Sequence, residues 1–137
     1  MSIQAKQDEI IAEFSSFNSP VDRYDHIIKI AKELPIIEKQ YKNEDCLIKG
    51  CQSKVWLHSE FNNNIVAFTA DSDTVITKGI IALLIRVLSG HTPKEIFESD
   101  LYFIDKIGMN KLFSPIRNNG LLEMVKQIKL YSKQYMG

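Results

Sequence analysis

The stretch that decides the fold is residues 50–70, which read GCQSKVWLHSEFNNNIVAFTA. Apolar and polar side chains alternate over residues 55–61, and a second run rich in β-forming residues covers 65–70. The asparagines at 62–64 tolerate positive φ and therefore favour a tight turn between the two runs. We predict an antiparallel hairpin here, with residues 47–49 as a candidate third strand.

Apolar residues recur at helical spacing on both sides of the hairpin and predict helices there. The most apolar helix, about residues 74–89, should be buried, and residues 71–73 offer N-caps for it. Gly79 inside it predicts a close approach by another backbone, because glycine costs a helix about 1 kcal/mol relative to alanine. The other predicted helices cover residues 6–17, run from Ser19-Pro20 to Pro35, follow Thr92 and Asp100, and start last at Asn118 or Asn119 after a loop at 114–117.

These elements predict a single α+β domain over residues 1–137. In this fold a small antiparallel sheet of about three strands packs against flanking helices. A chain of 137 residues with 45% apolar side chains is long enough for one buried core.

The charge balance and the hydropathy of the sequence argue against two classes of partner, nucleic acids and membranes. Lys and Arg total 17, as do Asp and Glu, so we expect no nucleic-acid partner, because phosphate binding needs concentrated positive charge. No membrane partner is expected, since residues 75–88 carry Lys78 and Arg86 and are shorter than the roughly 20 apolar residues of a membrane span. Residues 1–14 lack an export signal's apolar core, so the expected location is the reducing cytoplasm.

Cys51 is the candidate reactive residue, since it stands on a predicted turn directly before a predicted strand. The thiolate is the nucleophilic form of cysteine, and Lys49 and Lys54 would favour it if their side chains point toward the sulfur. Gly50 permits unusual backbone angles and leaves room for an incoming partner. The alternative is a buried cysteine that acts as a small apolar side chain, and the residues alone leave it open.

Other uses of the two thiols have less support. Four residues separate Cys46 from Cys51, unlike a CxxC redox site, and a zinc site usually needs four Cys or His ligands. We expect no metal and no cofactor, because His26, His58 and His91 do not stand at ligand spacing from the cysteines. A self-contained cysteine enzyme would need His58 or His91 as its base. We expect Cys46 to be a packed core or loop residue, with a resolving disulfide to Cys51 as the alternative.

Residues 48–57, IKGCQSKVWL, resemble the central motif of the SufE family, the sulfur-acceptor proteins that work with cysteine desulfurases. The likeness covers essentially the whole chain in the same order. It extends to residues 71–73, 78–82, 92–93, 114–117 and 120–121. The resemblance implies a compact α+β fold similar to the IscU-type cluster scaffolds.

The resemblance also implies a function for Cys51. A PLP-dependent cysteine desulfurase (SufS-like) would strip sulfur from cysteine, and Cys51 would accept it as a persulfide and stimulate that enzyme. Cys51 would then pass the sulfur to an iron–sulfur scaffold (SufB-like). The cofactor would belong to the partner, so this chain should turn over nothing alone and is not expected to be an enzyme. Gly50, Gln52 and Ser53 would support the loop, and Arg117 would either brace it or contact the partner.

The resemblance leaves one alternative and two expectations. The alternative function is an IscU-like module that binds a metal or a nascent cluster, although the chain lacks the several cysteine ligands of those scaffolds. Cys46 stands where relatives more often carry a polar residue without a thiol. An off-pathway disulfide between Cys46 and Cys51 is therefore an alternative. Because a persulfide is easily reduced or oxidised, we expect Cys51 to be partly buried at rest and to swing out on docking.

Overall fold

The hairpin predicted from residues 50–70 is present in the computed structural model, which describes residues 1–136. Strand β1 (Val55–Asn62) pairs antiparallel with β2 (Ile65–Ser72), and the register runs from Val55 opposite Ser72 to Asn62 opposite Ile65. Asn63 and Asn64 adopt φ values of 52° and 65°. A two-residue turn of this kind matches the right-handed twist of the strands, so the asparagines set the register.

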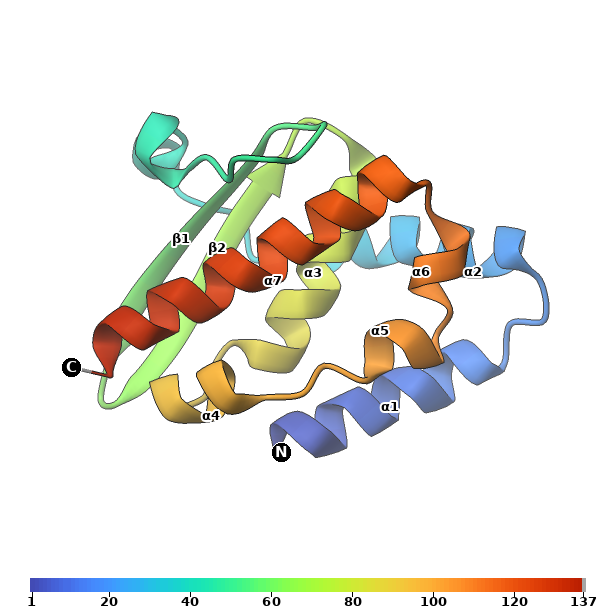
Figure 1. Ribbon diagram of the computed structural model, residues 1–137, viewed down its shortest axis with the longest axis horizontal. Coiled ribbons are helices and arrows are strands. Elements are labelled where there is room, and N and C mark those ends of the chain that lie inside the picture. The colour runs from blue at the N-terminus through green and yellow to red at the C-terminus, as the bar shows by residue number, and fades with distance from the viewer. Residues whose placement is uncertain (137) are drawn as a thin grey trace.

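Helices and short 3₁₀ turns surround the hairpin (Figure 1). In chain order the elements are α1 (Ile3–Ser15), α2 (Pro20–Ile30), η1 (Ala31–Glu33), η2 (Lys39–Tyr41), η3 (Glu44–Cys46), β1, β2, α3 (Val75–Leu88), α4 (Pro93–Glu98), α5 (Phe103–Lys106), α6 (Met109–Leu112) and α7 (Pro115–Tyr135). The α+β class is therefore confirmed. No helix within residues 1–136 combines the length and apolar character that a membrane crossing requires.

The predicted sheet of about three strands is one strand too large. Within the described residues the sheet has two strands, and Leu47 adds only an isolated bridge to Trp56. The Ile48 amide still donates to the Val55 carbonyl over 2.8 Å. Gly50 then adopts φ +86° and turns the chain away, so the ladder cannot extend into a third strand.

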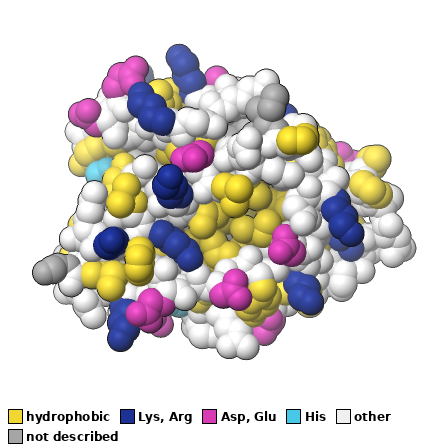
Figure 2. Space-filling model, viewed as in Figure 1, with side chains coloured by type: hydrophobic (Ala, Val, Ile, Leu, Met, Phe, Trp, Pro, Cys, Tyr) yellow, Lys and Arg dark blue, Asp and Glu magenta, His cyan; other side chains and the backbone are white. Residues whose placement is uncertain are grey.

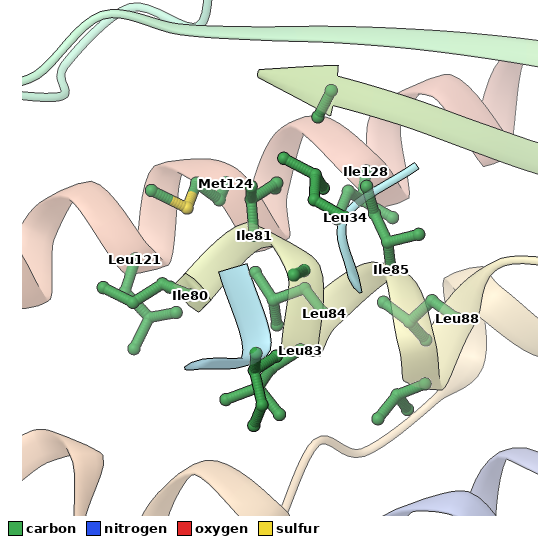
Figure 3. Close-up of a cluster of buried hydrophobic side chains, with 14 of the residues drawn as sticks. Leu34, Ile80, Ile81, Leu83, Leu84, Ile85, Leu88, Leu121, Met124 and Ile128 are labelled. Atoms are coloured by element: carbon green, nitrogen blue, oxygen red, sulfur yellow. The ribbon is translucent and has the colours of Figure 1, made fainter. Parts of the chain in front are cut away.

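Helix α3 is the centre of the packing and contacts β2, α1, α2 and α7. Figure 3 shows its apolar side chains meeting Leu121, Met124 and Ile128 of α7. The predicted close approach at Gly79 is confirmed, because a side chain there would collide with the carbonyl oxygen of Ile27 in α2. Glycine is thus required where α2 crosses α3, which fixes the end of α3 that faces the loop carrying Cys51.

The N-cap of α3 differs from the prediction. Thr74 occupies the cap position, and its side chain makes no hydrogen bond to the amides of the first turn. Asp71 instead pairs with Lys42 at 2.8 Å and with Lys78 at 3.3 Å. These ion pairs connect β2 to the segment before Cys46 and to α3.

Helix α7 begins earlier than predicted, because residues 114–117 are not a loop. The Ser114 side chain accepts from the Arg117 amide and caps the helix, and Pro115 is the first helical residue. Ser19 and Pro20 start α2 in the same way. The earlier start adds a turn to α7 and places this turn beside the loop that carries Cys51.

The outer surface mixes charges of both signs with scattered apolar side chains (Figure 2). Neither sign of charge forms a continuous field over the face shown. This distribution agrees with the equal numbers of acidic and basic residues in the sequence.

Candidate functional site

The C-terminal end of the loop that carries Cys51 is anchored to Ser72, the last residue of β2, and to Asp73, which follows it. The Lys54 amide donates to Asp73 Oδ1 over 3.0 Å, and Ser72 Oγ donates to the Lys54 carbonyl over 2.7 Å. The loop's other end contains Gly50 with its positive φ. Cys51 therefore lies between a backbone bend and a fixed attachment to the sheet.

Helix α7 covers the loop from a distant part of the sequence (Figure 1). The half-buried Cys51 thiol donates to the carbonyl of Gly120 over 3.5 Å. A Cβ on Gly120 would lie 3.7 Å from Cys51 Sγ, and a Cβ on Gly50 would lie 2.9 Å from Glu123 Cγ. The loop and α7 thus approach each other through two glycines.

A small cavity lies beside the thiol, between the loop, α3 and α7. Its volume is about 20 Å³. The residues that line it are Cys51, Gln52, Ser53, Thr77, Ile80, Arg117, Gly120 and Met124. A cavity needs about 10–15 Å³ to hold one water molecule, so this cavity has room for about one further atom and not for an extended substrate.

The electrostatics at the thiol oppose the sequence expectation. Burial raises the pKa of the Cys51 thiol, and the negative charge of Glu123 raises it further. Lys49 does not act as expected, because its ammonium pairs with Glu44 at 3.0 Å in an exposed position. Lys54 contributes its backbone groups to the loop, and its side chain is exposed. The resting thiol is therefore kept protonated.

Arg117 lies in the first turn of α7 and lines the cavity. Its Nη1 donates to the Tyr24 hydroxyl over 3.4 Å, and its guanidinium lies 5.8 Å from the centre of the Phe113 ring. The side chain is thus held from two sides next to the thiol. The structure brings Gln52, Ser53 and Arg117 to the cavity that Cys51 also lines.

Three hydroxyl groups form a cluster at the N-terminal end of α3. Ser53 Oγ and Thr74 Oγ1 are 3.0 Å apart, and Thr74 donates to Thr77 Oγ1 over 2.7 Å. Sequence reasoning missed Thr77 and Glu123, and it included Gly120 only in the resemblance, without a role at the thiol. The spacing of Thr74 and Thr77 places both in one helical turn, but no local signal indicated that the turn would face Cys51.

The histidines have other partners. His26 pairs with Glu13 at 2.8 Å, the His58 ring stacks on Tyr41 with centres 3.6 Å apart, and His91 lies 4.0 Å from Glu95. None of the three lines the cavity at Cys51. In the described part of the chain, no group of three His, Cys, Asp or Glu side chains is placed to hold a metal ion.

Cys46 and Cys51 are both free thiols, and both are half-buried. Cys46 ends the η3 turn, where its amide donates to Asn43 Oδ1 over 3.3 Å. Burial raises the pKa of the Cys46 thiol, and Asp45 raises it further. Cys46 therefore occupies a loop position in a capped turn, whereas Cys51 packs against the buried core.

Comparison with known proteins identifies relatives over most of the chain. The family model SufE, described as "Fe-S metabolism associated domain", matches residues 8–132. The chain is 34% identical over 134 residues to an uncharacterized SufE-like protein of Rhizobium etli, which covers 94% of this chain and 90% of that protein. It is 38% identical over 122 residues to SufE-like protein 1, chloroplastic/mitochondrial, of Arabidopsis thaliana, covering 88% of this chain and 33% of the plant protein.

Two further comparisons extend these findings. The chain is 30% identical over 123 residues to the cysteine desulfuration protein SufE of Plasmodium vivax, covering 87% of this chain and 49% of that protein. It also resembles the solution structure of a hypothetical protein from Thermus thermophilus, with a TM-score of 0.79, 19% identity and 96% of each chain covered. The second likeness concerns the fold alone.

Proposed function

The chain belongs to the SufE family, and from that premise we propose that Cys51 accepts sulfur from the persulfide of a PLP-dependent, SufS-like cysteine desulfurase. Acceptance clears the persulfide from the desulfurase and stimulates it. Cys51 then releases the sulfur to a SufB-like iron–sulfur scaffold. The cofactor is the desulfurase's own, and the protein works in a reducing compartment, the cytoplasm, where its thiols stay free.

The observation that carries this proposal is the small cavity at the Cys51 thiol. Its volume of about 20 Å³ suits the one sulfur atom that a carrier adds to its cysteine. A cysteine enzyme that acts on a larger molecule needs a substrate cleft and a base beside the thiol. Here the cavity is lined by Arg117 and hydroxyl groups, together with backbone and apolar side chains.

The transfer step is an exchange between two sulfur atoms. The Cys51 thiolate attacks the terminal sulfur of the donor persulfide and forms a new S–S bond. The donor's S–S bond breaks, and its electron pair stays on the donor cysteine, which becomes a thiolate. No oxidant is needed, and the rate depends on the thiolate fraction, the leaving group and access.

Docking has to change the state of the thiol before this step. Burial and Glu123 raise the pKa of Cys51 and keep it protonated in the resting loop. Moving the loop away from α7 removes both effects, and Gly50 supplies a point about which the backbone can turn. Exposure and ionisation of the thiol therefore occur together when the partner binds.

Mass spectrometry after incubation with the desulfurase and cysteine tests the proposal. We expect added mass in steps of one sulfur on the peptide that contains Cys51, and none on the peptide that contains Cys46. Hydrogen exchange over residues 48–54 should become faster when the desulfurase is added. Full stimulation of the desulfurase by Cys51→Ser would show that Cys51 is not the carrier.

A further inference from the structure

Thr77 places a buried hydroxyl group beside the Cys51 thiol. It is the third residue of α3, and only 5% of its surface is exposed. Both residues line the cavity of about 20 Å³. A buried hydroxyl has to find hydrogen-bond partners, because leaving it without them destabilises the fold.

The hydrogen bonds of Thr77 are unequal. Its Oγ1 accepts from the Thr74 hydroxyl over 2.7 Å. Its own hydrogen points to Ser53 Oγ at 3.4 Å, which is long for an O–H···O bond, whose usual length is about 2.7–2.8 Å. Thr77 is therefore firmly held as an acceptor and only weakly engaged as a donor.

Thr74 accounts for the orientation of Thr77. It is the N-cap residue of α3, yet its side chain makes no capping bond to the helix amides. Its hydroxyl is directed to Thr77 instead. This departure from normal capping turns the Thr77 hydrogen away from Thr74 and leaves it for another acceptor.

The thiol itself does not use this donor. Cys51 Sγ donates to the Gly120 carbonyl over 3.5 Å, on the α7 side of the cavity. A second sulfur attached to Sγ has the cavity as the nearest free volume, and Thr77 forms part of its α3 wall. The donor thus faces a position that is filled only when sulfur has been loaded.

We propose that the Thr77 hydroxyl donates a hydrogen bond to the terminal sulfur of the Cys51 persulfide and holds that sulfur in the cavity as an anion. The inference rests on the proposed function, which puts the persulfide on Cys51. A persulfide is more acidic than the thiol from which it forms, so its terminal sulfur is a charged acceptor. Hydrogen bonds to charged acceptors are about twice as strong as neutral ones.

Other charges at the cavity act on the same sulfur. Arg117 lines the cavity from α7 and attracts an anion, and the first turn of α3 carries partial positive charge. Glu123, which packs against Gly50, acts in the opposite direction. Thr77 adds a directional bond that distinguishes the persulfide from the resting thiol.

An exchange equilibrium with glutathione tests the proposal without a partner protein. The reaction converts Cys51–SH and glutathione persulfide into Cys51–S–SH and glutathione. The Cys51 thiolate attacks the terminal sulfur, the donor S–S bond breaks, and glutathione leaves with the electron pair and takes up the proton that Cys51 lost. Intact-mass spectrometry at a fixed persulfide-to-thiol ratio measures the equilibrium constant, with Cys46→Ser in every variant.

We expect Thr77→Val to lower this constant about tenfold, the effect of losing a hydrogen bond to a charged group. Thr77→Ser keeps the hydroxyl and should stay within about twofold of the parent. Thr74→Val keeps the Thr77 donor but removes the hydrogen bond that orients it, so its loss should be smaller than that of Thr77→Val. Alkylation of the unloaded Cys51 thiol should be the same in all four proteins.

Several results would overturn the inference. An unchanged constant in Thr77→Val would do so, as would an equal loss in Thr77→Ser or a larger loss in Thr74→Val than in Thr77→Val. A parallel change in thiol alkylation would show that Thr77 acts on the thiol instead. Thr77→Ala repeats the test if the valine variant does not fold. Failure of the proposed function looks different, since the parent protein would then take no sulfur from a desulfurase whatever Thr77 does.

Discussion

The two cysteines of this protein have pKa values shifted in the same direction, but their surroundings differ. Both are half-buried free thiols, and burial raises the pKa of each. Each also has a carboxylate that raises the pKa further, Asp45 for Cys46 and Glu123 for Cys51. The direction of the pKa shift therefore does not distinguish them.

The difference lies in the backbone and in the space beside the sulfur. Cys46 ends a 3₁₀ turn capped by Asn43. Cys51 follows Gly50 at φ +86° and faces a cavity between the loop and α7. A carrier needs room for one added atom and a loop that can leave its resting place. The residue types indicate such a loop, but they do not indicate the cavity.

Exchanging each thiol for a hydroxyl gives the largest expected effect. Cys51→Ser should reduce sulfur loading by a desulfurase to background, because the acceptor atom is gone. Cys46→Ser should load as the parent does. Intact-mass spectrometry measures both, and thermal unfolding checks that each variant folds. Normal loading of Cys51→Ser with loss in Cys46→Ser would reverse the comparison.

Gly50→Ala tests the backbone of the Cys51 loop. A left-handed alanine costs about 1–2 kcal/mol, and its Cβ would also displace Glu123. We expect that loss in urea unfolding, together with slower sulfur loading. Gly90→Ala is the matched control, since Gly90 has the same φ of +86° and open space at its Cβ position. It should lose similar stability and load sulfur normally, and slow loading in both variants would point to stability alone.

Glu123→Gln tests the electrostatic half of the comparison. Removing the charge should lower the pKa of Cys51 toward its ordinary value and raise the rate of iodoacetamide alkylation at neutral pH about two- to fourfold. Asp45→Asn should have this effect on Cys46 alone. Peptide mass spectrometry separates the two sites. An equal change at both thiols in either variant would contradict the assignment of one carboxylate to each.

The raised pKa of Cys51 also predicts a dependence of stability on alkaline pH. The folded protein binds the thiol proton more tightly than the unfolded chain, whose ordinary pKa is 9.0. The contribution is fully present below that pH and is lost as the pH rises through the folded pKa. The free energy of unfolding of the parent should therefore fall more steeply with pH than that of Cys51→Ser, and parallel curves would contradict this.

The smallest effect is expected from Asp71→Asn, which loosens the segment before Cys46. Burial would raise the pKa of Asp71, but hydrogen bonds from Lys42, the Ser72 amide and Lys78 outweigh it and leave the pKa below its ordinary value. We expect a loss of about 1 kcal/mol in urea unfolding at neutral pH and normal sulfur loading.

The pH dependence of that loss has a definite sign. Asp71 stabilises the fold above the ordinary pKa of 3.8, and the contribution is lost as the pH falls through the folded value. The unfolding curves of the parent and Asp71→Asn should converge in acid. A constant difference would mean that the asparagine acts through shape and not through charge.

The parts of the fold that depend on local chemistry can be predicted from the sequence. Asn63 and Asn64 can be recognised as a turn because few other residues accept positive φ. The capping box of Thr92 and Glu95 and the glycine at the α2–α3 crossing are predictable for equally local reasons. Cys51 is identifiable as the candidate thiol from its neighbours Gly50 and Val55.

The surroundings of the thiol cannot be predicted in the same way. Gly120 is separated from Cys51 by 69 positions, and their contact depends on where α7 begins. The Ser114-Pro115 pair starts a helix as Ser19-Pro20 does, although the sequence prediction places a loop there. The predicted charge at the thiol also has the wrong sign, because Lys49 turns to Glu44 and Glu123 approaches from α7.

The small hairpin has a consequence for how the protein behaves at high concentration. The outer edge of β2 is occupied at three positions: Val66 bonds to the backbone of residues 90–91, the Phe68 amide to Ser89 Oγ, and Ala70 to residues 35–37. Ile48 bonds to the outer edge of β1. Open strand edges are templates for intermolecular pairing, so this coverage protects β2 against self-association. The loop opening that we propose would leave this coverage of β2 in place, because residues 35–37 and 89–91 lie outside the loop.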